Sequence, residues 1–171
     1  MGLFSKKTPE EKAQKKESSV VFMGESLQPI GKIPAGKCVA LTLKPSDQVL
    51  NVHYDKIDIT LPYERLRGFR VDDEVSLAKS GSGLGGAIVG GALFGVGGAI
   101  VGQNAKKGKT KVKWIATLSY IDKDGNTQEL NFIQWGISGY YDGDVKHFGA
   151  SQFENVINDI VSRYGEDITE L

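Results

Sequence analysis

Residues 111–135 read KVKWIATLSYIDKDGNTQELNFIQW, and their pattern is the clearest indication of fold class in the chain. The first part alternates apolar and polar side chains, as a β-strand with one buried face does; its apolar positions are Val112, Trp114, Ala116, Leu118 and Tyr120. Residues 122–126 contain Gly125, which allows the positive φ of a tight turn. Residues 129–135 alternate again, with Leu130 and Phe132 on one face. The stretch therefore predicts a β-hairpin that lines a core.

The segments before this hairpin carry further strand patterns. Strands are predicted over residues 20–23, 37–44, 49–54, 57–61 and 66–71, which are rich in apolar and β-branched side chains. Proline, glycine and aspartate separate these runs, as they do in turns. The sequence therefore predicts a succession of short antiparallel strands.

The end of the chain has the period of a helix instead. After a loop at residues 136–149, Ser151 and Glu154 form the spacing of a capping box, which predicts a helix that begins at Ser151. Its apolar face comprises Phe153, Val156, Ile157, Ile160, Val161 and Tyr164. Gly165 is expected to end it. Strands followed by one helix predict an α+β domain.

Composition and charge set the domain limits. The chain has 171 residues, 21 basic and 21 acidic side chains and one cysteine, so it fits one domain without a disulfide framework. Residues 1–17 are expected to be a disordered or weakly helical basic tail, residues 18–165 a domain interrupted at 80–105, and residues 166–171 an acidic tail. The first residues lack the apolar core of a secretory signal, so we expect a cytoplasmic protein, with the inner face of the cell membrane as an alternative place.

The interruption is an uncharged run of 26 residues, 80–105. Its centre, residues 83–102, reads GLGGAIVGGALFGVGGAIVG. On a helix this centre has a bulky stripe and an opposite stripe of small residues, the pattern that lets helix backbones approach closely. The bulky stripe comprises Val89, Leu93, Val96 and Ile100, and the small stripe comprises Ala87, Gly91, Gly95, Gly98 and Gly102. Phe94 is a further bulky residue expected to take part in membrane contact or self-association.

Three interpretations of this glycine stretch remain open. Twenty residues of helix would span about 30 Å, which is the thickness of a bilayer core. However, each interior glycine costs a helix about 1 kcal/mol relative to alanine, so a single helix would need a partner. The hexapeptide GGAIVG occurs at residues 85–90 and again at 97–102, which favours two arms of a hairpin. The stretch is therefore a membrane segment, a packing zipper (of helical or β type) that joins copies or covers its own domain, or a glycine-rich loop.

Lysines follow the glycine stretch directly, at Lys106, Lys107, Lys109, Lys111 and Lys113. Basic side chains next to an apolar segment suit the anionic head groups of a membrane surface. The alternative is a solvated run of charge.

The order of elements resembles that of a pleckstrin-homology-like (PH-like) domain. Residues 59–71, ITLPYERLRGFRV, are similar to the bacterial PH-like motif in which a strand ends in Pro-Tyr and leads into the next strand. The glycine stretch is similar to glycine-zipper insertions in uncharacterised bacterial proteins with such domains. The resemblance implies a PH-like antiparallel barrel or sandwich with one C-terminal helix. It also implies a binding or scaffolding role, often at membranes, without catalytic residues.

Enzyme and nucleic-acid functions find little support. His53, His147 and Cys38 are too few and too scattered to predict a catalytic or metal site. Residues 122–126 lack the spacing of a calcium loop, and the glycines at 81–86 lack the strand–helix context of a phosphate loop. We therefore expect no catalytic, metal or cofactor residues, no nucleic acid and no small-molecule substrate. The expected partner is an anionic membrane surface or a second copy of the chain.

Overall fold

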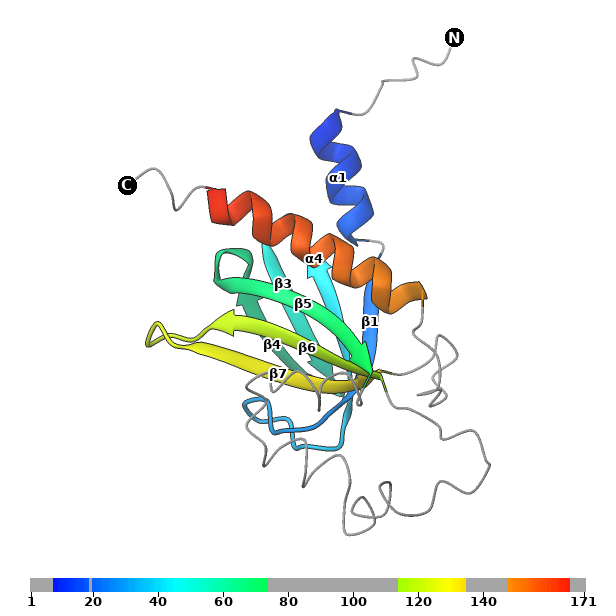
Figure 1. Ribbon diagram of the computed structural model, residues 1–171, viewed down its shortest axis with the longest axis vertical. Helices are drawn as coiled ribbons and strands as arrows, with labels where there is room; N and C mark the ends of the chain where they lie inside the picture. Colours follow the sequence, from blue (N-terminus) through cyan, green and yellow to red (C-terminus); the bar gives the residue numbers. More distant parts are fainter. Residues whose placement is uncertain (1–7, 19, 74–113, 135–147, 167–171) are drawn as a thin grey trace.

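The computed structural model describes residues 8–18, 20–73, 114–134 and 148–166 (Figure 1). They form one seven-stranded antiparallel sheet with helices at one end. The elements, in chain order, are α1 (Pro9–Ser18), β1 (Val21–Ser26), β2 (Cys38–Lys44), β3 (Val49–Tyr54), β4 (Ile57–Pro62), the 3-10 turn η1 (Tyr63–Arg65), β5 (Leu66–Asp73), β6 (Trp114–Ile121), β7 (Thr127–Gln134) and α4 (Phe148–Glu166). The α+β class is confirmed, and every predicted strand is present.

The strands lie in the order β4-β3-β2-β1-β7-β6-β5. Consecutive strands pair antiparallel, except that β4 and β5 lie at opposite edges, and β1 joins the two halves of the sheet. Its first part pairs with β2, from Val21 opposite Thr42 to Glu25 opposite Cys38. Its last part pairs with β7, from Gly24 opposite Gln134 to Ser26 opposite Phe132. The sheet is not closed, because β4 and β5 are its two edge strands.

Gly24 lies where β1 passes from one partner strand to the other. A Cβ atom built there would lie 2.8 Å from Cε1 of Phe22 and 3.0 Å from the backbone oxygen of Ile133. Real Cβ atoms do not approach other atoms so closely, so this site needs a residue without a side chain.

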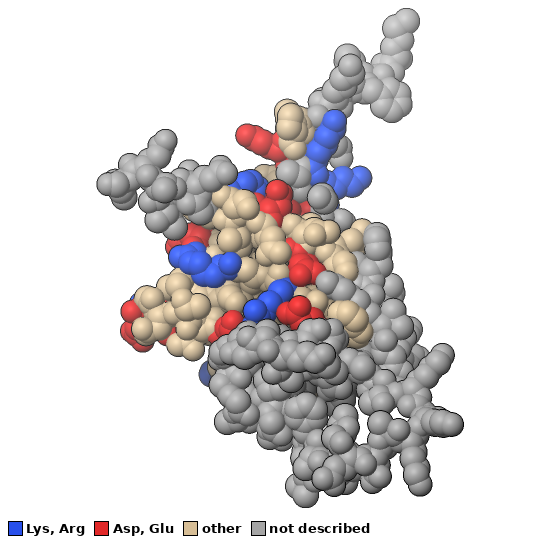
Figure 2. Space-filling view, in the orientation of Figure 1, with Lys and Arg blue, Asp and Glu red and all other residues tan. Residues whose placement is uncertain are grey.

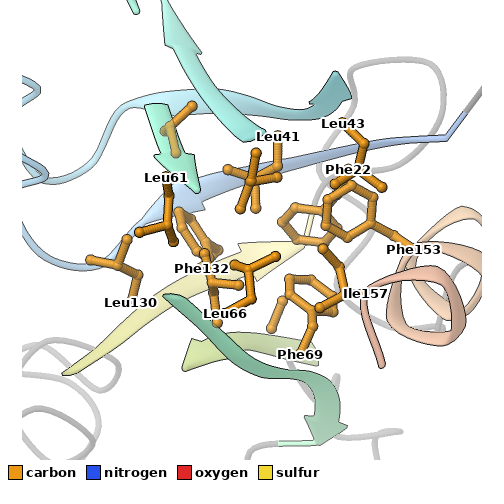
Figure 3. Close-up of a cluster of buried hydrophobic side chains, with 14 of the residues drawn as sticks. Phe22, Leu41, Leu43, Leu61, Leu66, Phe69, Leu130, Phe132, Phe153 and Ile157 are labelled. Atoms are coloured by element: carbon orange, nitrogen blue, oxygen red, sulfur yellow. The ribbon is translucent and has the colours of Figure 1, made fainter. Parts of the chain in front are cut away.

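The hydrophobic core lies on the concave face of the sheet and under α4. Figure 3 shows side chains from both halves of the sheet meeting there with those of the helix. Phe22 packs against the rings of Phe69, Phe132 and Phe153, with ring centroids 5.2, 6.0 and 5.9 Å away. Ala116 and Leu118 are fully buried, and Trp114 and Tyr120 pack against the same core. The face predicted for the strand 111–121 is therefore confirmed over its described residues.

Helix α4 lies across the end of the sheet and packs mainly on β5 (Figure 1). Its predicted apolar face is correct, since Phe153, Val156, Ile157 and Ile160 are buried. Its predicted start is wrong, because the helix begins at Phe148 rather than Ser151. Glu154 does not close a capping box with Ser151. Instead its Oε1 accepts the backbone N–H of Val71 at 3.3 Å.

Helix α1 occupies much of the segment expected to be a disordered or weakly helical tail. A capping box that the sequence analysis overlooked explains its start. Thr8 Oγ1 accepts the N–H of Glu11 at 3.2 Å, and Glu11 Oε2 accepts the N–H of Thr8 at 2.9 Å. Pro9 follows at the first helical position, where a missing N–H does no harm.

Candidate functional site

The residues predicted to carry function lie outside the described residues. This holds for the glycine stretch, with Ala87, Gly91, Gly95, Gly98 and Gly102 and their bulky neighbours Val89, Leu93, Phe94, Val96 and Ile100. It also holds for the lysines Lys106, Lys107, Lys109, Lys111 and Lys113. What the structure does describe is the place on the sheet where the segment that contains them begins and ends.

This segment, residues 74–113, connects two neighbouring strands. Strands β5 and β6 pair from Leu66 opposite Tyr120 to Asp73 opposite Trp114. Opposed residues of an antiparallel pair have Cα atoms about 4.5–5.5 Å apart. The two ends of a 40-residue insertion are therefore held side by side at one end of a hairpin. We call the pair Asp73 and Trp114 the root of the insertion.

The rest of the hairpin root is well anchored. Trp114 packs against the core, and Ile115 is 1% exposed. On the strand β5, Arg70 bridges its neighbours: its Nε lies 3.6 Å from Asp72 Oδ2 and its Nη2 lies 3.8 Å from Glu129 Oε1 on β7. The root is thus fixed to the body of the sheet, and both ends of the insertion leave from the same edge region.

A second feature is a groove of about 500 Å³ between α1, the turn from β2 to β3, η1 and the end of α4. Glu17 lies in it and is 4% exposed, although it belongs to a very polar helix. Glu17 Oε1 accepts a hydrogen bond from Arg163 Nη2 at 2.5 Å, and Oε2 lies 3.5 Å from the Tyr63 hydroxyl. Burial, and then the nearby carboxylate of Glu17, raise the pKa of Tyr63 well above its usual range.

The contacts of Glu17 fasten α1 to the body. The side chains of Glu10, Glu11, Lys12, Gln14 and Lys15 are exposed, so among the described side chains of this helix Glu17 makes the buried contact. The groove therefore holds an ion pair that is already satisfied within the chain. We regard it as the docking point of α1 rather than as a substrate site.

The outer face of β3 and β4 carries a small polar cluster. Asp58 Oδ1 accepts a hydrogen bond from Asn51 Nδ2 at 2.7 Å and lies 3.0 Å from His53 Nδ1. The hydrogen bond from Asn51, followed by that from His53, lowers the pKa of Asp58. A histidine oriented by a carboxylate supplies two of the three members of a catalytic triad. The cluster could be catalytic only if a reactive nucleophile lies next to His53.

That nucleophile would be Cys38, and its environment is unsuitable. Ala40 on β2 is the register partner of His53, so Cys38 lies two residues along from it on the same face. Burial, and then the carboxylate of Glu25, raise the pKa of the Cys38 thiol. A reactive cysteine needs the opposite shift. Among the described residues no group of three or more His, Cys, Asp or Glu side chains could hold a metal ion.

In the turn at residues 122–126, the carboxylate of Asp122 makes its hydrogen bonds within the hairpin itself. Asp122 Oδ1 accepts hydrogen bonds from the backbone N–H groups of Asp124 and Asn126, each at 2.9 Å. Asp122 Oδ2 accepts a hydrogen bond from Gln128 Nε2 at 2.9 Å. These bonds, with the N–H of Asn126 first, lower the pKa of Asp122. Gly125 has a φ of +84°. The expectation of a turn rather than a calcium loop fits this arrangement.

On the face that Figure 2 draws, the described residues show no gathering of basic side chains. Figure 2 shows acidic and basic side chains interspersed over the described part of the face that it draws. This agrees with the net charge of zero. A nucleic-acid site would need Lys and Arg gathered on one face.

No protein-family model matches the chain, and no curated protein matches it either. Within the described ranges, no helix is both long enough and apolar enough to cross a bilayer. The spacing of Thr8 and Glu11 in the sequence is sufficient to predict the capping box of α1. The sequence carries no signal for the pairing of Glu17 with Arg163, which are 146 residues apart.

Proposed function

We propose that this protein is a non-enzymatic, PH-like binding or scaffolding protein that contacts an anionic membrane through its glycine-rich insertion. In this proposal the sheet and helices remain in the cytoplasm at the inner face of the cell membrane. The observation that carries the proposal is the root of the insertion. An uncharged run of 26 residues, followed by five lysines, belongs to the segment that connects the paired ends of β5 and β6.

The PH-like part of the proposal is supported by the order of elements. Seven antiparallel strands are followed by one helix that covers the end of the sheet. Strand β1 pairs with both β2 and β7, so it belongs to both halves, as in a partly open barrel. Residues 59–71, which carry the resemblance, span the end of β4, the turn η1 and most of β5.

The root also constrains how the insertion meets a bilayer. Because Asp73 and Trp114 are neighbours, whatever enters the bilayer must leave it on the same face. A single crossing by residues 83–102 would require a second passage, either by residues 74–82 with Glu74 and Lys79 or by residues 103–113 with five lysines. Each lysine costs about 2.5–3.5 kcal/mol at the bilayer centre, so the path with five lysines costs on the order of 15 kcal/mol, and the other path also buries charge. We therefore propose that the insertion enters one leaflet as a hairpin or rests on the surface.

Liposome flotation tests this function. The full chain is compared with a variant in which residues 80–105 are replaced by a short Gly-Ser turn, which the in-register root can accommodate. A second variant changes Lys106, Lys107, Lys109, Lys111 and Lys113 to Gln. We expect the full chain to float with vesicles that contain phosphatidylserine, the deletion to remain in solution, and the lysine variant to bind less at low salt. Equal flotation of the full chain and the deletion would contradict the proposal.

The alternative function is a soluble homo-oligomer assembled through the glycine zipper. The small stripe of Ala87, Gly91, Gly95, Gly98 and Gly102 favours it, since such stripes allow close helix packing. Replacing Gly91 and Gly95 by Leu separates the two functions. Added bulk should leave membrane binding intact or increase it, whereas a zipper should lose its assembly, as measured by light scattering without lipid.

A further inference from the structure

The two edge strands of the open sheet differ in whether side chains from other elements bind their outward backbone groups. At the β5 edge, α4 provides substitutes for a neighbouring strand. Asn158 Oδ1 accepts the N–H of Phe69 and Asn158 Nδ2 donates to the Phe69 carbonyl, each at 3.1 Å. Glu154 accepts the N–H of Val71. The β5 edge is also irregular, because its register shifts between Leu66 and Gly68. Side-chain cover and irregularity are two ways in which proteins protect an edge strand.

The β4 edge has no such cover. Strand β4 pairs with β3 from Ile57 opposite Tyr54 to Pro62 opposite Val49. Across the described residues, no hydrogen bond from another element reaches the outward side of β4. The pairing of β4 with β3 shows no register shift, and Lys56 directly precedes the strand. Ile57 and Ile59 at this edge are only half buried. A regular edge with apolar side chains is a template for another strand.

The β3–β4 turn determines which backbone groups point outward. Residues Asp55 and Lys56 form a two-residue turn, and Asp55 has a φ of +51°. The pair that flanks such a turn, Tyr54 and Ile57, is a hydrogen-bonded pair, and bonded pairs alternate with non-bonded ones. Asp58 and Thr60 therefore direct their N–H and C=O groups away from β3. Pro62 follows in the same series, where its missing N–H does not disturb the β3 pairing.

The outward backbone groups of Asp58 and Thr60 favour one antiparallel register for pairing with β4 of a second copy. If the two-fold axis passes through Ile59, Asp58 of each copy faces Thr60 of the other, and both residues exchange backbone hydrogen bonds. If the axis passes through Asp58, two carboxylates face each other, which is unfavourable. If it passes through Thr60, Asp58 faces Pro62, which has no N–H to donate. The register through Ile59 also places the half-buried Ile59 side chains of the two copies opposite each other, and each half-buried Ile57 opposite Leu61 of the other copy.

We propose that β4 is a dimerisation edge, where two copies of this chain pair antiparallel through Ile59 to form one continuous sheet. The interaction is separate from the glycine stretch, because it uses the edge of the sheet opposite to β5. It goes beyond the proposed function, and either can fail without the other.

Cysteine cross-linking tests the register directly in the full chain. In a Cys38→Ser background, Ile59→Cys puts the two thiols opposite each other at the two-fold axis, in a non-hydrogen-bonded pair with short Cβ separation. Asp58→Cys, one residue away, is the register control, and Thr127→Cys on the exposed tip of β7 is the collision control. We expect mild oxidation to give a covalent dimer at least tenfold faster for Ile59→Cys than for either control.

A second experiment weakens the pairing of the β4 edge without introducing a reactive side chain. Thr60→Pro deletes the outward N–H and leaves the bonds to β3, whereas Thr60→Ala keeps the N–H. We expect sedimentation velocity to show a dimer for Thr60→Ala and a dissociation constant roughly tenfold to a hundredfold higher for Thr60→Pro, as the loss of two backbone hydrogen bonds implies. Circular dichroism checks that both variants fold. The proposal is overturned if the chain sediments as a monomer at 100 μM, or if a dimer forms without preference for Ile59→Cys.

Discussion

Asn158 makes two of the side-chain hydrogen bonds that cover the β5 edge of the sheet, and replacing it tests how much these two bonds contribute. Asn158→Ala removes two hydrogen bonds of 3.1 Å, one to the N–H and one to the carbonyl of Phe69. Each contributes about 0.5–1.5 kcal/mol net, so the pair contributes roughly 1–3 kcal/mol. Alanine is the better helix former by about 0.6 kcal/mol, which partly hides the loss.

The matched control is Asn155→Ala, an exposed position on the same helix. It carries the same propensity gain without the contact to β5. We expect Asn158→Ala to be less stable than Asn155→Ala by about 1–3 kcal/mol in urea unfolding, which corresponds to roughly 2–10 °C in melting temperature for a chain of this length. Hydrogen exchange at the Phe69 amide should rise in parallel. Equal stabilities for the two variants would refute the idea that α4 seals this edge.

Three further changes probe other parts of the fold. Gly24→Ala should destabilise the protein by about 1–3 kcal/mol in urea unfolding, because its Cβ would meet Phe22 and backbone, whereas Gly68→Ala has its nearest contact at 3.8 Å and should be almost neutral. Arg163→Ala should leave the Glu17 carboxylate buried without its cation and speed proteolysis within α1; adding Glu17→Gln should restore part of the loss, and additive effects would argue against the pair. Cys38 should be alkylated by iodoacetamide with a pH midpoint above that of a free thiol, because burial raises the pKa of its thiol; a midpoint below that of a free thiol would contradict the assigned environment.

The strands were predictable because their side chains alternate with a period of two. In residues 114–121 the predicted face is inside, with Ala116 and Leu118 buried and the turn after Ile121 at the expected place, but Ile115 and Thr117 on the opposite face are buried as well. The pairing of β1 with β7 was not predictable in the same way. It depends on the close approach of Phe22 and Ile133 to Gly24, which only the folded structure reveals.

Polar residues on helices were the main source of error. Asn158 and Glu154 lie among the polar positions of α4, where a sequence pattern indicates solvent, yet both bind the backbone of β5. Glu17 in the polar helix α1 is buried for the same reason, since its partner Arg163 comes from the far end of the chain. Periodicity identifies apolar faces and cannot identify polar contacts between distant segments. The glycine stretch, on which the functional prediction depends, lies outside the described residues and stays a prediction.

The paired root at Asp73 and Trp114 also has a consequence for folding order. Closing a loop of 40 residues costs about 2 kcal/mol more entropy than closing a tight turn of four, by the logarithmic dependence on length. The β6–β7 hairpin closes through five residues, so it should form before β5 joins β6. Because the entropy of loop closure varies only with the logarithm of loop length, lengthening or shortening the insertion changes the stability of the sheet only slightly. The β5–β6 junction is therefore a position where segments of different length can be exchanged while the rest of the domain keeps its fold.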